Sequence, residues 1–342
     1  MPTRNTLTKD APTVRSRKVA AVRRNILNNS TSRQKYIQGV KLLKQEFLGP
    51  TTADFGIAGT VRRISTYDLF VVWHHLAMFT FTPPSQGDRN AAHRGPVFLP
   101  WHRFMLILFE LQLQRVLNDD NFGLPYWDWA ADGERSPDQQ MTSPVWGTQC
   151  MGGQGNPVTT GPFAFNLADP ARWRVRVDAD VNGQLRATDR GLRRAFAQRR
   201  SDQSSAPVLP RRTEVTSAAN LSTYDAWPWS TASSGFRNRL EGWQPVHPYS
   251  GLHNRVHVWV GGDMLPSSSP NDPVFYLNHC NVDRVWAAWL ASRGTTYVPS
   301  QSASSTLRGH RIDDAMNALL SDPVTPRQML DVDDFYSYDT LA

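Results

Sequence analysis

The sequence contains only two cysteines among its 342 residues, Cys150 and Cys280, which is too few for a framework of disulfide bonds. It also lacks long apolar runs. Residues 1–30 hold no stretch that could serve as the hydrophobic region of a signal peptide, and no later stretch approaches a membrane span. From the sequence we therefore expect a cytoplasmic chain with no membrane partner.

Charge of one sign is not strongly concentrated, although the formal net charge is +7. This charge comes partly from the N-terminal segment and from the short pairs Arg193-Arg194, Arg199-Arg200 and Arg211-Arg212, within stretches typical of solvated loops. Binding to nucleic acid depends on a basic surface that neutralises several phosphates. We therefore expect no nucleic-acid partner.

The chain has enough apolar sequence for one sizeable core, with 40% hydrophobic residues, 12 tryptophans and no internal repeat. We expect a single domain over residues 1–342, with residues 1–30 as a basic lead-in. Between residues 133 and 217 the composition predicts long loops that shape the mouth of a site, with strand-like pieces such as 172–177. Helical patterns are expected at 32–47, 67–75, 101–111, 236–241, 255–260, 272–292 and 313–320.

Six of the nine histidines fall into two groups of three. In one group, His253 and His257 are four positions apart, so they project from one face of a helix, and His279 follows on the next expected helix. Neutral imidazoles at this spacing bind zinc, copper, iron or nickel. This group predicts a metal site built from two helices.

The other group consists of His74, His93 and His102. His74 lies in an apolar helical stretch, whereas His93 and His102 are nine positions apart, about half a turn out of phase on one helix. Pro96 and Pro100 are expected to break the helix, leaving His93 on a loop and His102 in the first turn of a new helix. This arrangement predicts a second metal-binding triplet.

The residues around these histidines form five motifs: His-Arg-Gly-Pro-Val-Phe-Leu-Pro-Trp-His-Arg (93–103), Leu-Pro-Tyr-Trp-Asp-Trp (124–129), Ser-Gly-Phe-Arg-Asn-Arg-Leu-Glu-Gly-Trp (234–243), Leu-His-Asn-Arg-Val-His-Val-Trp-Val-Gly-Gly (252–262) and Asn-Asp-Pro-Val-Phe-Tyr-Leu-Asn-His (271–279). Together they resemble the type-3 copper proteins of the tyrosinase family, in particular the bacterial, Streptomyces-like tyrosinases. The resemblance implies a mostly α-helical fold in which a four-helix bundle holds a dicopper centre, surrounded by long loops and a few short strands.

The resemblance also assigns the ligands and the co-substrate. It implies that one copper ion is bound by His74, His93 and His102, that a second is bound by His253, His257 and His279, and that O₂ is the co-substrate. The aromatic ending at 335–338 resembles the point where the catalytic core of the family stops. We therefore expect no C-terminal domain that blocks the site.

Two residues, Glu241 and Asn254, stand where the family carries its proton-accepting groups. In the family, a glutamate at the first position holds a water near the second copper, and an asparagine at the other position helps that water take the phenol proton. A phenol titrates near pH 10, so a base must accept its proton at neutral pH. The resemblance implies that both monophenols and o-diphenols are oxidised to o-quinones.

Two more residues are candidates for positioning the ligands or the substrate. Asp283 lies one turn after His279 and is expected either to orient a ligand ring or to be a helix-surface carboxylate beside Arg284. Asn278 stands where bacterial relatives usually carry a histidine, which would alter the substrate fit or the proton path. The entrance loop 265–269 is rich in small and turn-forming residues and predicts an open mouth.

Three functions remain open at this point. The first is a copper-dependent oxidase of monophenols and o-diphenols. The second is an o-aminophenol or catechol oxidase with little monophenol hydroxylation, which Asn278 and the open entrance keep in view. The third is a haemocyanin-like oxygen carrier, which would need a bulky residue over the copper pair, and the entrance loop shows none. A hydrolytic two-zinc site is disfavoured because these triplets include no bridging carboxylate.

The resemblance also bears on partners. The substrate is expected to be a small phenol or o-aminophenol, in melanin or secondary-metabolite biosynthesis. Streptomyces-like tyrosinases are typically loaded with copper, and some are exported, together with a small partner protein that carries the signal. A small copper-chaperone partner, and export in its company, are therefore compatible with a chain that has no signal of its own.

Overall fold

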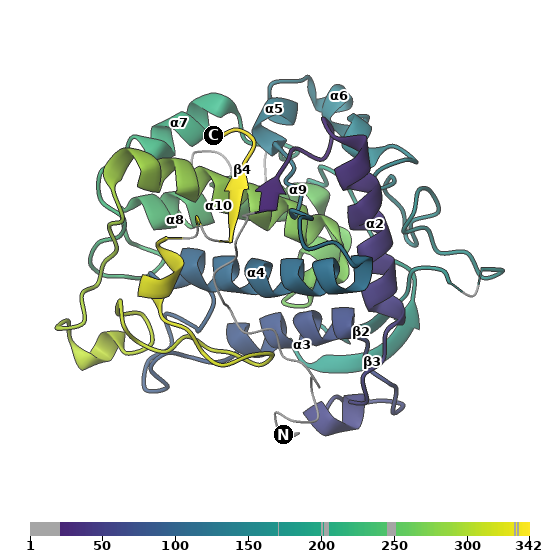
Figure 1. Cartoon of the computed structure of the whole chain (residues 1–342), viewed down its shortest axis with the longest axis horizontal. Helices are drawn as coiled ribbons and strands as arrows, with labels where there is room; N and C mark the ends of the chain where they lie inside the picture. Colours follow the sequence, from purple (N-terminus) through teal and green to yellow (C-terminus); the bar gives the residue numbers. More distant parts are fainter. Residues whose placement is uncertain are drawn as a thin grey trace.

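The computed structural model describes residues 21–342 except residues 170, 200, 202–204, 245–250, 332 and 334. Figure 1 shows that this part of the chain is mostly α-helical, which confirms the predicted fold class. The helices are α2 (Ser30–Gln45), α3 (Thr66–Met78), α4 (Phe98–Leu117), α5 (Trp129–Gly133), α6 (Pro137–Met141), α7 (Arg212–Ala219), α8 (Phe236–Glu241), α9 (Leu252–Val260) and α10 (Val274–Arg293). Short 3₁₀ turns are η1 (Thr52–Phe55), η2 (Pro144–Trp146), η3 (Gly262–Met264), η4 (Ser269–Asn271), η5 (Ser305–Leu307) and η6 (Pro326–Met329).

The strands form two small two-stranded sheets. Strand β1 (Ala21–Arg23) pairs in parallel with β4 (Tyr336–Tyr338), so the two ends of the described chain lie side by side. Strand β2 (Val175–Ala179) pairs antiparallel with β3 (Leu185–Arg190) and overlaps the strand-like piece expected from the sequence. Of the expected N-terminal lead-in, residues 1–20 lie outside the described residues, whereas 21–23 belong to the fold.

Helices α3, α4 and α10 lie roughly one above another in Figure 1, and α2 crosses them at one end. Helix α4 packs against both α2 and α10, and α9 packs against α10. The rings of Phe109 from α4 and Tyr276 from α10 stack, with centroids 3.6 Å apart. The buried apolar side chains of the described residues form one continuous core around these helices.

Helix α3 begins where Ser65 accepts a hydrogen bond from the backbone N–H of Asp68, which satisfies one of the free donors at the helix start. The helix is apolar on nearly all sides, as expected for a helix buried within a core. The Asp68 carboxylate pairs with Lys44 of α2, and both side chains are buried. This pair fixes α3 against α2.

Helix α4 begins at Phe98, earlier than the sequence predicted. Pro100 therefore lies inside the first turn, where its missing N–H costs no helical hydrogen bond. His102 consequently lies at the start of the second turn, and the prediction that it lies in the first turn is wrong. The prediction that His93 lies on a loop is confirmed.

Two other segments differ from expectation. Residues 313–320 form mostly bends and irregular chain instead of the predicted helix, and the N–H of Met316 donates to the carbonyl of Val324, a bond that a helix does not make. Residues 133–217 are not loops alone, since they include α6, η2 and the β2–β3 hairpin.

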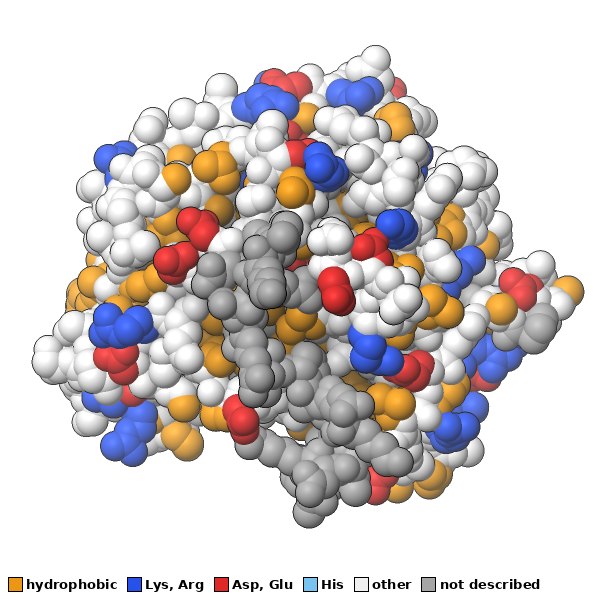
Figure 2. All heavy atoms as spheres, viewed as in Figure 1, with side chains coloured by type: hydrophobic (Ala, Val, Ile, Leu, Met, Phe, Trp, Pro, Cys, Tyr) orange, Lys and Arg blue, Asp and Glu red, His pale blue; other side chains and the backbone are white. Residues whose placement is uncertain are grey.

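Surface features complete the description. On the face drawn in Figure 2, Lys and Arg side chains are interspersed with Asp and Glu side chains among the described residues. Exposed ion pairs elsewhere include Arg327 with Asp313 and Arg186 with Asp180. None of the described helices is long and apolar enough to cross a membrane.

Candidate metal centre

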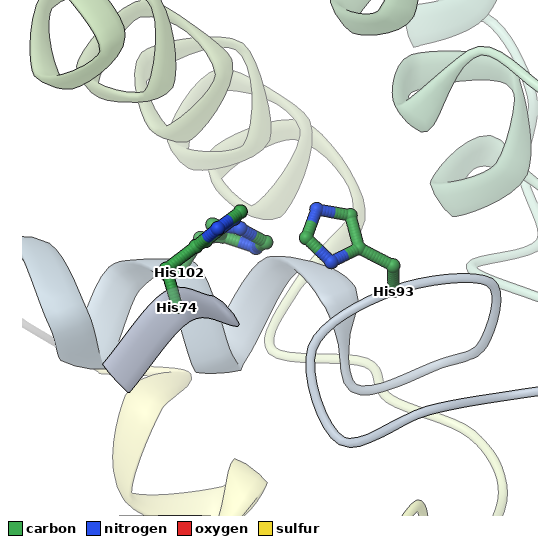
Figure 3. A group of neighbouring side chains, drawn as sticks. All are labelled: His74, His93 and His102. Atoms are coloured by element: carbon green, nitrogen blue, oxygen red, sulfur yellow. The ribbon is translucent and has the colours of Figure 1, made fainter. Parts of the chain in front are cut away.

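The first triplet combines two helices and a loop. His74 comes from α3, His102 from α4, and His93 from the loop that precedes α4, as Figure 3 shows. One ring nitrogen from each of the three histidines lies within 4.8 Å of the other two. All three side chains are buried. The structure therefore brings together the first set of ligands that the sequence predicted.

The second triplet joins α9 and α10. His253 and His257 are one turn apart on α9, and His279 projects from α10. The Nε2 atom of His279 lies 3.0 Å from Nε2 of His253 and 3.4 Å from Nε2 of His257. Four helices (α3, α4, α9 and α10) thus supply five of the six histidines, which agrees with the predicted four-helix bundle.

Backbone carbonyls fix the tautomer of four rings. A carbonyl oxygen only accepts hydrogen bonds, so an Nδ1 atom that bonds to one carries the proton and leaves a lone pair on Nε2. The Nδ1 atoms donate in the pairs His74–Ser267 (2.7 Å), His102–Phe98 (2.8 Å), His253–Glu241 (3.1 Å) and His257–Met264 (2.6 Å). The buried Nε2 atoms of His74 and His102 have no hydrogen-bond partner. These unpartnered lone pairs are what a metal ion requires.

The end of η3 and the entrance loop that follows it help to aim both triplets. The carbonyl of Met264 holds His257, and the carbonyl of Ser267, three residues later, holds His74. Leu265 is exposed, whereas Ser267, Ser268 and Ser269 are buried. The loop that predicted an open mouth thus lines the cavity and also contacts the histidines.

Burial keeps the rings neutral. Desolvation lowers the pKa of His74 to about 3 and that of His257 to about 4. The pKa values of His93, His102, His253 and His279 are lowered well below the usual 6.5 by desolvation and then by neighbouring histidines. At neutral pH the metal-free centre presents uncharged imidazoles, which is the form that binds a metal ion.

The donor set fits copper. Each triplet supplies three imidazole nitrogens and no carboxylate, and imidazole suits copper and zinc more than magnesium or calcium. The triplets adjoin, since the His93 and His253 rings, one from each, have centroids 6.3 Å apart. The residues therefore fit a pair of metal ions held side by side.

A cavity of about 520 Å³ opens over both triplets. It is lined by His74 and His93 from the first and by His253 and His257 from the second, together with Met78, Gly242, Trp243, Asn254, Val258, Leu265, Pro266 and Ser269. A larger hollow of about 630 Å³ lies between α2 and residues 148–162, but its lining includes no histidine. The cavity over the triplets is the candidate substrate site.

Asn254 and Glu241 hold different positions around this cavity. The Asn254 side chain lines it, and its Oδ1 atom lies 3.0 Å from Nδ1 of His253. Glu241 is fully buried behind the wall, where its carboxylate accepts hydrogen bonds from the Arg94 backbone N–H, from Trp243 Nε1 and from Arg237. Desolvation raises the pKa of Glu241, and the Arg237 charge opposes that rise.

Asp283 lies one turn after His279 on α10 and bonds to Arg103 of α4, but it contacts no ligand ring through a hydrogen bond among the described residues. Its carboxylate accepts hydrogen bonds from two arginines and two tyrosines, Arg23, Arg103, Tyr336 and Tyr338. None of these groups is a ligand, and Asp283 is buried, so it is not a surface carboxylate beside Arg284. It joins α10 to α4, β1 and β4, and its nearest link to a ligand is Arg103, the residue after His102.

Asn278 is fully buried one position before His279 and is not part of the cavity lining. Neither polar atom of its amide has a hydrogen-bond partner among the protein atoms. An unsatisfied buried amide is costly, so a water within the core would stabilise this position.

Sequence reasoning missed the groups that hold Glu241. Arg237 precedes Glu241 by four positions on α8, and this spacing places them on one helix face. That spacing could have identified the pair. The carbonyls of Phe98, Met264 and Ser267 left no signal, because any residue supplies a carbonyl.

These observations agree with the comparison with known proteins. Residues 64–292, more than half of the chain, match the common central domain of tyrosinase. The chain belongs to the tyrosinase family. The family's centre is a pair of copper ions, and the two triplets fit it.

Relatives extend over most of the chain. Tyrosinase from Streptomyces glaucescens is 38% identical over 285 residues, which is 82% of this chain and 91% of that protein. Grixazone synthase from Streptomyces griseus is 36% identical over 308 residues, 82% of this chain and 92% of that protein. A polyphenol oxidase structure from Thermothelomyces thermophila superposes with a TM-score of 0.67 at 21% identity and covers 94% of this chain and 89% of that one. That likeness shows the shared fold.

Proposed function

We propose that this protein is a dicopper oxidase that uses O₂ to convert monophenols and o-diphenols to o-quinones. The observation that carries the proposal is the pair of adjoining triplets, each with three neutral imidazoles, beneath one cavity. Two copper ions bound there would supply the two electrons that reduce one oxygen molecule, which a single ion cannot do alone. The family membership and the curated tyrosinases among the relatives support the same assignment.

The cavity walls suit an aromatic ring. Trp243, Val258 and Leu265 contribute apolar lining, and the amide of Asn254 lies beside the His253 ring. Such a pocket removes water from a phenol ring and leaves its hydroxyl group directed toward the polar end. The ring is thus oriented by shape and by desolvation of its apolar face.

The proton of a monophenol needs an acceptor, and Asn254 and Glu241 are the proposed groups. Asn254 lies on the cavity wall, so its amide can hold a water against the substrate hydroxyl. The Glu241 carboxylate lies directly behind Trp243, to which it is hydrogen-bonded at 2.8 Å. A carboxylate has about four acceptor positions, and three are occupied here, so one remains for a water that takes the proton.

A second candidate function is oxidation of o-aminophenols. No side chain that lines the cavity carries a permanent charge, as far as the described residues extend. An o-aminophenol is uncharged at neutral pH, so the pocket accepts it without desolvating an ion. Leu265 at the mouth is 57% exposed and leaves the entrance open to a substituted ring.

The partner and the compartment remain proposals from the sequence. We propose that a small partner protein loads the copper, and that the chain itself is cytoplasmic unless exported with such a partner. Copper-loaded protein produced with and without co-expressed candidate partners, and compared for copper content, would test the first point.

Oxygen consumption tests the function directly. Copper-loaded protein is offered a monophenol, catechol and an o-aminophenol in separate oxygen-electrode runs, with His257→Ala as the control. We expect uptake with the first two substrates and none from the variant. Uptake with the o-aminophenol alone would favour the second function, and reversible O₂ binding without turnover of any phenol would favour an oxygen carrier.

A further inference from the structure

We infer that Glu241 is a positioning residue that braces both histidine triplets, through its carboxylate on one side and its backbone carbonyl on the other. The inference rests on the proposed metal centre. It assigns Glu241 a task that is separate from accepting a proton and that acts before any substrate arrives.

The carboxylate holds the loop of the first triplet. Its Oε1 atom accepts a hydrogen bond from the backbone N–H of Arg94 at 2.7 Å, and Arg94 directly follows the ligand His93. Arg94 has φ +64°, a left-handed conformation that costs energy for a residue with a side chain. The bond to Glu241 therefore stabilises the loop in a conformation that it would not hold unaided.

The backbone carbonyl of the same residue holds the second triplet. It accepts a hydrogen bond from Nδ1 of His253 at 3.1 Å, which keeps the proton on Nδ1 and directs Nε2 toward His279. One residue thus contacts a ligand of one triplet and the neighbour of a ligand in the other. A shift of Glu241 would move both.

Glu241 is itself fixed by a buried chain of charges. Its Oε2 atom accepts from Arg237 at 2.8 Å, and Arg237 donates in turn to Asp225 at 2.8 Å, with all three side chains buried. Ser233 donates a further hydrogen bond to Asp225. Moving the Glu241 carboxylate would break one of the two buried ion pairs of Arg237 and leave the guanidinium with Asp225 alone, which is unfavourable.

The two tasks of Glu241 differ in what they predict. If Glu241 only accepts a proton through water, its removal slows monophenol oxidation and leaves metal binding unchanged. If it braces the triplets, its removal weakens metal binding in protein that has never met a substrate.

The test measures copper affinity on metal-free protein. Glu241→Gln is titrated with copper in competition with a chelator. Glutamine keeps the shape, but with its oxygen on the Arg237 guanidinium it turns an amide donor toward the backbone N–H of Arg94, so the bond to the loop is lost. We expect affinity for at least one ion to fall by about 10-fold to 100-fold, as for other groups that support ligands. Affinity equal to that of the parent protein would overturn the inference.

Glu110→Gln is the matched control. Glu110 is also a buried glutamate that accepts from an arginine, Arg23, and from a backbone N–H, that of Leu124. It contacts none of the six histidines. We expect this variant to bind copper like the parent. An equal loss of copper affinity in both variants would contradict the inference, because it would show that any buried glutamate paired with an arginine supports the metal centre.

A rescue variant makes the test specific to the loop. Glycine adopts φ near +64° without a steric cost, so Arg94→Gly should hold the loop with less help from Glu241. We expect Arg94→Gly to restore part of the affinity lost in Glu241→Gln. No recovery would contradict the role assigned to the carboxylate.

Folding and function are controlled separately. If Glu241→Gln does not fold, Asp225→Asn is used instead. This variant weakens the hold on Arg237, and so on the Glu241 carboxylate, without replacing Glu241 itself. Weaker copper binding is expected and unchanged binding contradicts the brace. If the parent protein binds two ions but oxidises no phenol, the proposed function alone is refuted. If the parent protein is active and Glu241→Gln binds copper as tightly as the parent, the brace alone is refuted.

Discussion

The imidazole rings of His102 and His279 are stacked, with centroids 4.2 Å apart and planes inclined by 15°, although each ring belongs to a different triplet. His102 comes from α4 and His279 from α10, and Phe98 lies against both rings. The two metal sites are therefore in direct contact through these stacked rings. A change at one of them is expected to reach the other.

Replacing His102 by alanine tests this coupling. The first site loses a ligand, and the His279 ring loses the surface that it packs against, so His102→Ala should lose one ion and bind the second about 10-fold more weakly. Elemental analysis after equilibrium dialysis measures both effects. His75→Ala is the control, because His75 neighbours a ligand but bonds to the Ser267 hydroxyl and should retain two ions. Unaltered affinity for the remaining ion in His102→Ala would refute the coupling.

Asn254→Ala should separate the two reactions. The His253 ring keeps its bond to the Glu241 carbonyl, so metal binding should be unchanged. Loss of the amide proposed to hold a water should lower kcat for a monophenol by about 100-fold, within the range for a general base, and kcat for catechol by less than about 10-fold. Steady-state rates on both substrates measure this. An equal loss on the two substrates would argue against a role in proton transfer.

Asp283→Ala should lower the free energy of unfolding and leave metal binding by the folded protein largely unchanged. It leaves Arg23 and Arg103 buried without their shared carboxylate, and breaking a buried pair in this way costs about 3–5 kcal/mol. Urea denaturation of the metal-free protein measures the loss. The folded fraction should still bind two ions per chain, since Asp283 contacts no ligand ring. A fully stable variant that fails to bind metal would instead support a direct role at the centre.

Metal-free protein should lose stability in mild acid. His74 and His257 have folded pKa values of about 3 and about 4, below the 6.5 of an exposed imidazole. The unfolded chain therefore binds more protons than the folded chain as the pH falls below 6.5, and the folded state is disfavoured. The loss should reach about 1.4 kcal/mol per pH unit for each histidine, continuing to about pH 4.

Thermal denaturation checks this pH dependence. The Tm of metal-free protein should fall between about pH 7 and about pH 5, with a shallower fall in the His257→Gln variant, which lacks one of the titrating groups. A Tm that is constant or rises over this interval would show that the rings are already charged or exposed in the folded chain.

Local patterns predicted which histidines come together in each triplet, because some of them are related by short spacings. His253 and His257 are separated by one helical turn, and Pro96 lies on the loop just before α4, between His93 and His102. What the sequence could not show were partners far apart along the chain. Asp283 bonds to Arg23, 260 positions away, and Glu241 to Arg94, 147 positions away.

Two predicted elements differ from the structure for different reasons. The pattern at 313–320 favoured a helix, but the backbone N–H of Met316 bonds to Val324 instead. Helix α4 starts before Pro100 because a proline is tolerated in the first turn, which a rule that treats proline only as a breaker misses. In both cases tertiary contacts or position within the element outweighed local propensity.

The most direct test of the account combines copper content with oxygen uptake on one preparation. Apo protein is titrated with copper while bound metal and catechol-dependent O₂ consumption are recorded at each step. Activity should stay near zero until the second ion binds and should be complete at two ions per chain. Full activity at one ion per chain, or two bound ions without any phenol-dependent uptake, would contradict a catalytic pair of metal ions.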